Sequence, residues 1–365
     1  MSFFGLMKRD IDKFKRKGSV DGLIRALGYR KDPEIRMEAA KALGELDNAR
    51  AVRPLIGAML EDSDPDVRHT AVMALGKIGV PAVEPLMGEL WNTNQTNRNK
   101  QTAIVEALVK IGDPAIKPLI QTLWDPHKGK RLHMPVAEAI GKIGATAIRS
   151  LIVELPKFDR SGQEFAIEVL VTIGSPAIEQ LIHALHDGDV NVRVAAAKAL
   201  AATGDARAVD PLCWILKDPN KVVRKAAVEA LDTLKWKPDS TWKGVWYWVT
   251  KGNIQKCLAA DPSAFDILIA MFKAEEPSET FAARALGQTG DPRAVEPLIA
   301  ALTHSLYYRK RAAAEALVAL YQKGNLSSRE KHQILGMREV MAKPHDDIDR
   351  PSDCTHADEG IGIEY

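Results

Sequence analysis

The sequence is poor in the features that mark several common classes of protein. It contains only three cysteines, Cys213, Cys257 and Cys354, which are far apart and never form a CxxC pair. We therefore expect free thiols in a reducing compartment rather than a disulfide framework. Aromatic residues make up only 6% of the 365 residues. Together with abundant alanine and leucine, this composition is typical of a helical protein with small contacts between its helices.

Long hydrophobic runs and an excess of either charge are also missing. No stretch of about 18 uninterrupted apolar residues occurs, so we expect no membrane span. The start, "MSFFGLMKRDIDKFKRKG", places apolar residues before basic ones, which is the reverse of a signal peptide. The formal net charge of +2 argues against a nucleic-acid binder and against an acidic solvating protein. These features together predict a cytoplasmic protein.

A short phrase recurs along the chain at a nearly fixed spacing. It reads SVDGLI at 19, AVRPLI at 51, AVEPLM at 82, AIKPLI at 115, AIRSLI at 147, AIEQLI at 177, AVDPLC at 208, AFDILI at 264 and AVEPLI at 294. A second phrase, such as AVMALGKIG or VAEAIGKIG, follows most copies. A fixed period of this size predicts a solenoid, in place of the two or three compact domains that length alone would suggest.

Each unit has the start and stop signals of two helices. Asp64 and Pro65 form a helix cap and first helical residue, and Gly79 provides the left-handed residue that ends the helix. In the preceding helix, Pro54 is expected to cause a kink or a restart. No segment alternates with the period of two that marks a strand.

The two phrases, with Asp-Pro-x-Val-Arg between them, resemble HEAT repeats, most closely the short variety named after phycobilisome lyases. The resemblance covers about 19–321. It implies an all-α α-solenoid, a right-handed superhelix of about nine HEAT-like helical hairpins. It implies no single function, because the family includes scaffolds, chromophore lyase subunits, DNA glycosylase-like members and an iron-dependent hydroxylase.

Departures from the repeat divide the chain into segments. We expect an N-terminal capping arm (1–18), repeats 1–7 (19–235), a tryptophan-rich helical insert (236–263), repeats 8–9 (264–325), a C-terminal helix (326–343) and an acidic His/Asp tail (344–365).

Four residues after most expected caps lies a position that we call the arginine slot. It holds Arg36, Arg68, Arg193, Arg224 and either Arg309 or Lys310. We expect a ladder in which each arginine bonds the loop between helices or a neighbouring aspartate. In the third, fourth, fifth and eighth units the slot instead holds Gln101, His133, Gln163 and Glu279. The middle of the stack is therefore expected to be less regular, with His133 as a candidate partner-binding residue.

Three glutamates form the second departure. Glu106, Glu138 and Glu168 occupy one equivalent position in three successive units. They predict an acidic stripe on the concave side, suited to a basic peptide or a polyamine-like cation. The alternative is a solvated face in which Glu106–Lys110 and Glu138–Lys142 pair at i,i+4.

The insert is the third departure, with four of the seven tryptophans. Trp242, Val245, Trp246 and Val249 are spaced to share one helix face, while Tyr247 and Trp248 lie off it. Trp242, Trp246, Tyr247 and Trp248 are candidate partner-binding residues. The alternative is a helical pair whose tryptophans fill a break in the solenoid.

The tail "HDDIDRPSDCTHADEGIGIEY" holds most of the candidate metal ligands. His345, Asp347, His356 and Asp358 would supply a divalent metal site, the only cofactor we expect. However, His356 follows His345 by eleven positions, and this spacing matches no compact set of metal ligands. A plain charged tail therefore remains the alternative.

Two functions remain open. The first is a non-catalytic scaffold that binds a protein or peptide partner. The second is a metal-dependent enzyme or a phycobilin-lyase-like subunit with the tail at its site. A hydroxylase of this fold would use His-Glu pairs, and the sequence contains no His-Glu dipeptide; a phosphate-binding GxxxxGK[ST] loop is also missing. The sequence leaves the oligomeric state open.

Overall fold

The computed structural model describes residues 3–93, 97–260, 264–273, 279–303, 307–323 and 326–336. All regular structure in these ranges is helical, and none of them contains a strand. The chain divides into two compact units, unit 1 (Met1–Lys237) and unit 2 (Pro238–Tyr365). Each is described by itself.

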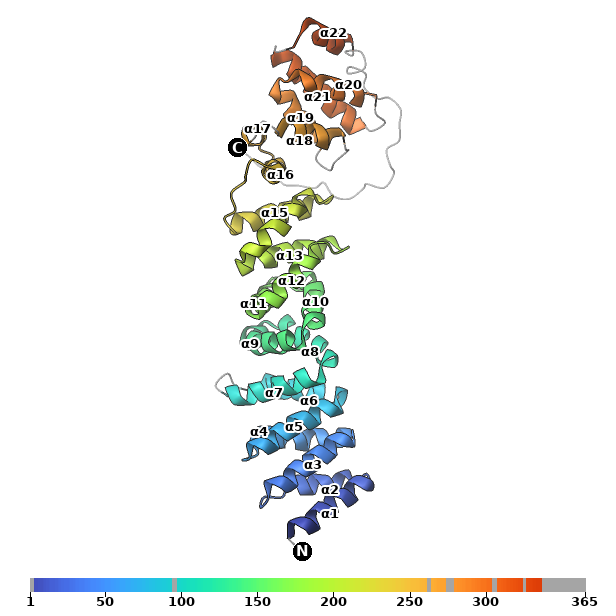
Figure 1. Ribbon diagram of the computed structural model, residues 1–365, viewed down its shortest axis with the longest axis vertical. Helices are drawn as coiled ribbons and strands as arrows, with labels where there is room; N and C mark the ends of the chain where they lie inside the picture. Colours follow the sequence, from blue (N-terminus) through green and yellow to red (C-terminus); the bar gives the residue numbers. More distant parts are fainter. Residues whose placement is uncertain are drawn as a thin grey trace. The chain divides into compact units, whose positions relative to one another are not determined.

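Unit 1 is a stack of seven helical pairs (Figure 1). The first helices of the pairs are α2 (Val20–Leu27), α4 (Val52–Glu61), α6 (Val80–Asn92), α8 (Ile116–Gln121), α10 (Ala145–Glu154), α12 (Ser175–Ala184) and α14 (Val209–Trp214). The second helices are α3 (Pro33–Glu45), α5 (Pro65–Ile78), α7 (Arg98–Ile111), α9 (Pro126–Ile143), α11 (Arg160–Ile173), α13 (Val190–Thr203) and α15 (Lys221–Thr233). Short 3₁₀ turns, η1 to η6, lie beside several first helices.

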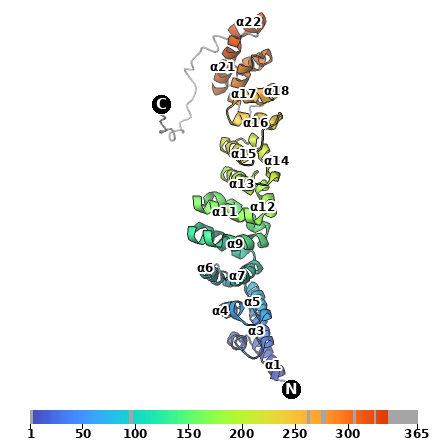
Figure 2. The same ribbon diagram turned by 90° about the vertical axis from the view of Figure 1, so that its left-hand side faces the viewer.

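The two sets of helices form two layers. Each second helix packs on the next one along the chain, from α3 on α5 to α13 on α15. In Figure 2, α9, α11, α13 and α15 follow one another on one side of unit 1, with α12 and α14 on the other. Unit 1 is therefore a solenoid, and its second-helix layer is a continuous surface.

The helix ends follow the predicted signals. The Asp64 carboxylate accepts hydrogen bonds from the amides of Asp66 and Val67, and Gly79 ends α5 with φ = 67°. Pro54 produces a restart: a 3₁₀ turn at Ala49–Ala51 is followed by α4, which begins at Val52. Pro54 thus lies in the first turn, where its missing N–H removes no helical hydrogen bond.

Small residues let the second helices approach closely. A Cβ atom added to Gly44 of α3 would lie 2.7 Å from the Cα atom of Ala74 in α5. A Cβ atom on Gly76 would lie 2.6 Å from the Cβ atom of Lys110 in α7. Because real Cβ atoms do not approach so closely, these glycines set the distance between neighbouring pairs.

The first pair of unit 1 is covered by α1 (Phe3–Arg16), which packs on α2 and α3. Ile11 of this helix is buried, and a Cβ atom on Gly22 would collide with the ring of Phe14 at 2.6 Å. The helix therefore covers apolar surface that a terminal repeat would otherwise expose.

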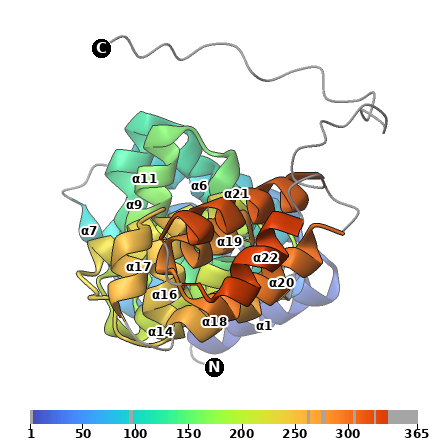
Figure 3. The same ribbon diagram turned by 90° about the horizontal axis from the view of Figure 1, so that it is seen from above.

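Unit 2 begins with α16 (Trp242–Thr250) and α17 (Ile254–Ala260) and continues with two further pairs. These are α18 (Ala264–Lys273) with α19 (Glu279–Thr289), and α20 (Val295–Ala301) with α21 (Tyr307–Lys323); the turn η7 (Pro292–Ala294) precedes α20. α19 packs on α21, and Figure 3 shows these two on one side with α18 and α20 on the other. The described residues thus form the nine hairpins that the repeats predict.

The last described helix is α22 (Ser328–Gly336). Ser327 caps it through a reciprocal arrangement. The Ser327 hydroxyl oxygen accepts from the Glu330 amide at 3.3 Å, and the Glu330 carboxylate accepts from the Ser327 amide at 2.6 Å. Within the described residues, a helix thus begins in the predicted C-terminal segment, and Ser327 is its cap.

Candidate functional site

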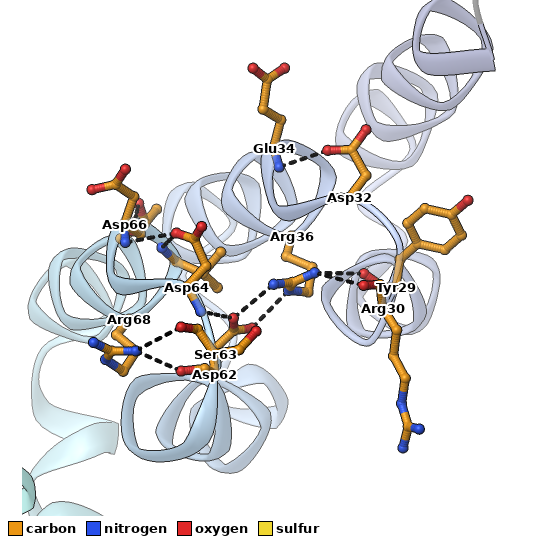
Figure 4. Close-up of polar contacts among 12 residues, drawn as sticks. Tyr29, Arg30, Asp32, Glu34, Arg36, Asp62, Ser63, Asp64, Asp66 and Arg68 are labelled. Atoms are coloured by element: carbon orange, nitrogen blue, oxygen red, sulfur yellow. Dashed lines mark hydrogen bonds and ion pairs between the residues drawn. The ribbon is translucent and has the colours of Figure 1, made fainter.

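The arginine slot forms the predicted ladder at the N-terminal end of unit 1 (Figure 4). The Arg36 guanidinium donates through Nε and Nη2 to the two carboxylate oxygens of Asp62, both at 2.8 Å, and through Nη1 to the carbonyl oxygen of Tyr29 at 3.0 Å. Arg68 donates to the carbonyl oxygen of Asp62 at 2.8 Å. Each arginine therefore ties its own helix to the loops before it or after it.

The Arg36–Asp62 ion pair, which we call one rung of the ladder, is buried. The side chains of Arg36 and Asp62 are only 8% and 10% exposed. Burial raises the pKa of the Asp62 carboxyl, but hydrogen bonds from Arg36 and from the Asp64 amide, with the charges of Arg36 and Arg68, leave that pKa below its ordinary value. The carboxylate is thus ionised at neutral pH.

The ladder recurs towards the end of unit 1 and in unit 2. Arg193 donates to both carboxylate oxygens of Asp218 at 2.8 and 3.1 Å, and Arg224 donates to the Asp218 carbonyl oxygen at 2.8 Å. In unit 2, Arg309 donates to the carbonyl oxygen of Phe272 at 2.9 Å. Arg309, and not Lys310, therefore fills the slot there.

In the middle of unit 1 the slot is filled differently. Gln163 donates to the carbonyl oxygen of Phe158 at 3.1 Å, which reproduces one bond of an arginine. Gln101 is only 9% exposed, and its side-chain amide has no hydrogen-bond partner among the described residues. The slot of the eighth unit holds Glu279, whose side chain lies outside the described part of the chain.

The fourth unit corrects the predicted spacing. α9 begins at Pro126 and is capped by Asp125, so His133 lies eight residues after its cap rather than four. The helix is extended at its N-terminal end, because Asp125 and Pro126 provide a start signal earlier than in the other units. The Nδ1 atom of His133 lies 3.0 Å from the carbonyl oxygen of Lys130.

Three grooves open on the second-helix layer of these middle units. We name them by helices that line them. The α5–α7 groove has a volume of about 560 Å³ and includes His69 and Glu106. The α7–α9 groove, of about 670 Å³, includes Gln101, His133 and Glu138, and the α9–α11 groove, of about 780 Å³, includes His133 and Glu168. The structure therefore brings all four of these predicted residues, His133 and the three glutamates, to neighbouring grooves of one layer.

The glutamates differ in their surroundings. Glu138 pairs with Lys142 at 2.7 Å, as the solvated-face interpretation predicts. Glu106 instead lies 3.7 Å from His69 of the neighbouring helix. Glu168 is exposed, and no basic side chain in the described part of the chain pairs with it. The acidic stripe is thus partly neutralised by the protein itself.

Most of the aromatic surface predicted for the insert is buried in unit 2. Trp246 and Tyr247 are 2% and 4% exposed, whereas Trp242 and Trp248 are half-buried. Tyr247, although it lies off the face shared by Trp242 and Trp246, is also buried, since α16 packs on both α17 and α18. Trp246 and Tyr247 therefore leave little area for a partner. Trp248 lies beneath the Lys256 ammonium, which is 4.6 Å from the ring centroid.

Sequence reasoning missed several residues of the α7–α9 groove. Arg98, Arg131 and Met134 line it, and the Met134 side chain is 49% exposed. A signal was present, because the atypical segments 91–101 and 124–135 are rich in basic residues. A further groove of about 1090 Å³ on the first-helix layer, lined by Trp124 and Val153, was also missed.

The predicted metal ligands His345, Asp347, His356 and Asp358 lie outside the described residues. Within the described ranges, no three His, Cys, Asp or Glu side chains gather as a metal site requires. Two of the three cysteines, Cys213 and Cys257, are buried free thiols. No helix of the described segments is long and apolar enough to cross a membrane.

Several solved structures are similar to this chain. Human deoxyhypusine hydroxylase in complex with glycerol shares 21% identity over 63% of this chain and 97% of its own, with a TM-score of 0.22. An engineered protein shares 23% identity over 60% of this chain and 98% of its own, with a TM-score of 0.22. The karyopherin Kap121p bound to the SUMO protease Ulp1p shares 14% identity over 88% of this chain and 39% of its own, with a TM-score of 0.30.

Family comparisons agree with the fold. Among curated proteins, none matches the chain significantly. The HEAT-repeat family matches residues 8–64, 52–141 and 148–232, and the PBS lyase HEAT-like repeat matches residues 281–304. Because the HEAT-repeat matches span more than half of the sequence, this chain belongs to the HEAT-repeat family.

Proposed function

We propose that this protein is a non-catalytic scaffold that binds a protein or peptide partner along the three grooves of the second-helix layer of unit 1. The supporting observation is that the grooves lie at the units in which the arginine slot is irregular. The grooves open beside α7, α9 and α11, the three second helices of unit 1 in which the residue four positions after the cap is not an arginine. Elsewhere in unit 1 an arginine occupies the slot and bonds the loops.

A solenoid suits this function because its binding surface is ordered before the partner arrives. Neighbouring packed helices lie about 8–10 Å apart, and a peptide in the polyproline II conformation advances about 3.1 Å per residue with three residues per turn. Side chains about three residues apart along a peptide would therefore reach successive grooves. Met134 and Val171 offer exposed apolar contacts there, and Glu168 offers a charge with which no described basic side chain pairs.

The half-buried Trp242 and Trp248 of the insert are kept as a second candidate contact. Cys213 and Cys257 are buried and form no disulfide. This supports a reducing, cytoplasmic setting for the protein. A metal-dependent or lyase-like activity of the tail is not proposed, because no described residue supports it.

A photo-crosslinking experiment tests the proposal. A photoreactive amino acid is placed at Met134 in the full chain, and a matched variant carries it at Trp214 of α14, which is 59% exposed in the first-helix layer. We expect a discrete partner protein to crosslink from Met134 and not from Trp214, in cells of the source organism. Equal crosslinking from both positions, or none from Met134, would contradict the proposed surface.

A further inference from the structure

The α7–α9 groove carries positive charge that unit 1 does not neutralise. Its lining includes Arg98, Arg131 and Lys142 against a single acidic side chain, Glu138. Lys142 and Glu138 cancel each other through their ion pair. Arg98 is exposed, and no carboxylate pairs with it or with Arg131 in the described part of the chain. Two uncompensated guanidinium groups therefore border one groove.

Two donors of this groove also lack acceptors. The Nη2 atom of Arg131 donates to the carbonyl oxygen of Trp91 at the end of α6, but its Nε atom is buried without a hydrogen-bond partner. Gln101 lines the same groove, and no described residue bonds its side-chain amide, which still reaches solvent. A buried donor without an acceptor, such as the Arg131 Nε atom, is unfavourable, so the groove favours a ligand that brings acceptor atoms.

The arginine ladder of this protein shows which acceptor suits a guanidinium group. Arg36 and Arg193 each direct Nε and Nη2 to the two oxygens of a carboxylate, that of Asp62 and that of Asp218. A carboxylate matches the guanidinium because two parallel N–H donors meet two oxygens. No aspartate of the protein plays this part for Arg131 among the described residues.

We propose that the α7–α9 groove binds an acidic side chain, aspartate or glutamate, of the partner peptide. Its carboxylate accepts hydrogen bonds from the Arg131 Nε and from the Gln101 amide, while Arg98 adds charge at the rim. This inference rests on the proposed scaffold function and names the chemistry of its ligand. Since Glu168 lies in the next groove without a basic partner, the peptide carries a basic residue about three positions from the acidic one.

Selection from a random peptide library tests this chemistry. Phage-displayed 12-residue peptides are selected on the full chain, and the enriched sequences are compared with those selected on Arg98→Glu. Residue 98 is the first residue of α7, where glutamate favours the helix dipole, so this variant is expected to fold. Arg149→Glu is the matched control, because Arg149 is an exposed arginine of α10 in the first-helix layer.

We expect wild type and Arg149→Glu to enrich peptides with an aspartate or glutamate near a basic residue. Arg98→Glu should bind the leading peptide about tenfold more weakly by calorimetry, and replacing the acidic residue of the peptide with its amide should weaken binding to the wild-type chain. Gln101→Met, which keeps the volume and removes the amide, should also weaken binding of the acidic peptide.

Three outcomes count against these ideas in different ways. Enriched peptides without acidic residues, lost on Met134→Glu, would overturn the acidic ligand and leave the scaffold proposal standing. An equal effect of Arg98→Glu and Arg149→Glu would overturn the assignment of the ligand to this groove. Failure to enrich any peptide on the wild-type chain would overturn both this inference and the proposed function.

Discussion

The Arg36–Asp62 rung gives the sharpest test of how neighbouring helical pairs are held together. In Asp62→Asn the side chain keeps its shape but loses its charge and one of the two acceptor oxygens. Arg36 would then remain 8% exposed, with a positive charge that no longer has a hydrogen-bonded carboxylate. The loss of stability should therefore be confined to the junction between α3 and α5 and should not extend to distant helical pairs.

The expected magnitude follows from the burial of both partners. Exposed ion pairs contribute about 0–1 kcal/mol, whereas removing one partner of a buried pair costs about 3–5 kcal/mol. Both side chains of this pair are at most 10% exposed. Because asparagine retains one acceptor, we expect the lower end of that range, about 3 kcal/mol. A second substitution, Arg36→Met, should recover part of this loss, because it removes the unbalanced charge.

Hydrogen exchange measured by mass spectrometry provides a local assay. The opening free energy of amides in α3 and α5 is compared between wild type, Asp62→Asn and the control Asp21→Asn. Asp21 pairs with Arg50 at 2.7 Å, but both side chains are about two-thirds exposed. We expect the control to change the opening free energy by less than about 1 kcal/mol. If Asp62→Asn changed it no more than the control, the structural role assigned to the ladder would be refuted.

Further predictions concern pH, helix packing and thiol chemistry. Because the pKa of Asp62 is lowered in the folded protein, its stabilising effect is present above the unfolded value of about 4 and is lost as pH falls below it; acid denaturation followed by circular dichroism should be shallower in Asp62→Asn. Gly44→Ala should destabilise unit 1 by about 1–3 kcal/mol in urea titrations, because its Cβ atom would collide with Ala74. The control Gly57→Ala, with nothing within 4 Å, should stabilise it by about 0.5–1 kcal/mol. Burial raises the pKa of the Cys257 thiol to about 11, so a thiol reagent at pH 8 should label it only after unfolding; prompt labelling of native protein would contradict its burial.

The repeat, the helix ends and the ladder could be predicted because each depends on residues close in the sequence. Asp64 caps a helix that begins at the next residue, and Gly79 ends it fourteen residues later. Arg68 reaches only to the loop that precedes its own helix. Short-range signals of this kind need no knowledge of the neighbouring pairs, so a single sequence is sufficient to find them.

The candidate site depended on contacts between pairs, which the sequence could not supply. Tyr247 lies off the helix face shared by Trp242 and Trp246, yet it is buried, because α17 and α18 both pack on α16. The unmet donor of Arg131 becomes visible only when the surroundings of its Nε atom are known. Periodicity predicts which residues share a helix face, but the neighbours that cover this face are set by the packing of whole helices.

The ladder also bears on how such a chain can lengthen. The pair α4/α5 supplies the acceptor Asp62 to the arginine before it and the donor Arg68 to its own loop. A duplicated copy of such a pair would arrive with its own anion and its own cation in the correct register. Gene duplication can therefore add whole modules at these junctions without new stabilising mutations. An insertion between Arg36 and Asp62 that changed this register would instead separate the donor from its acceptor.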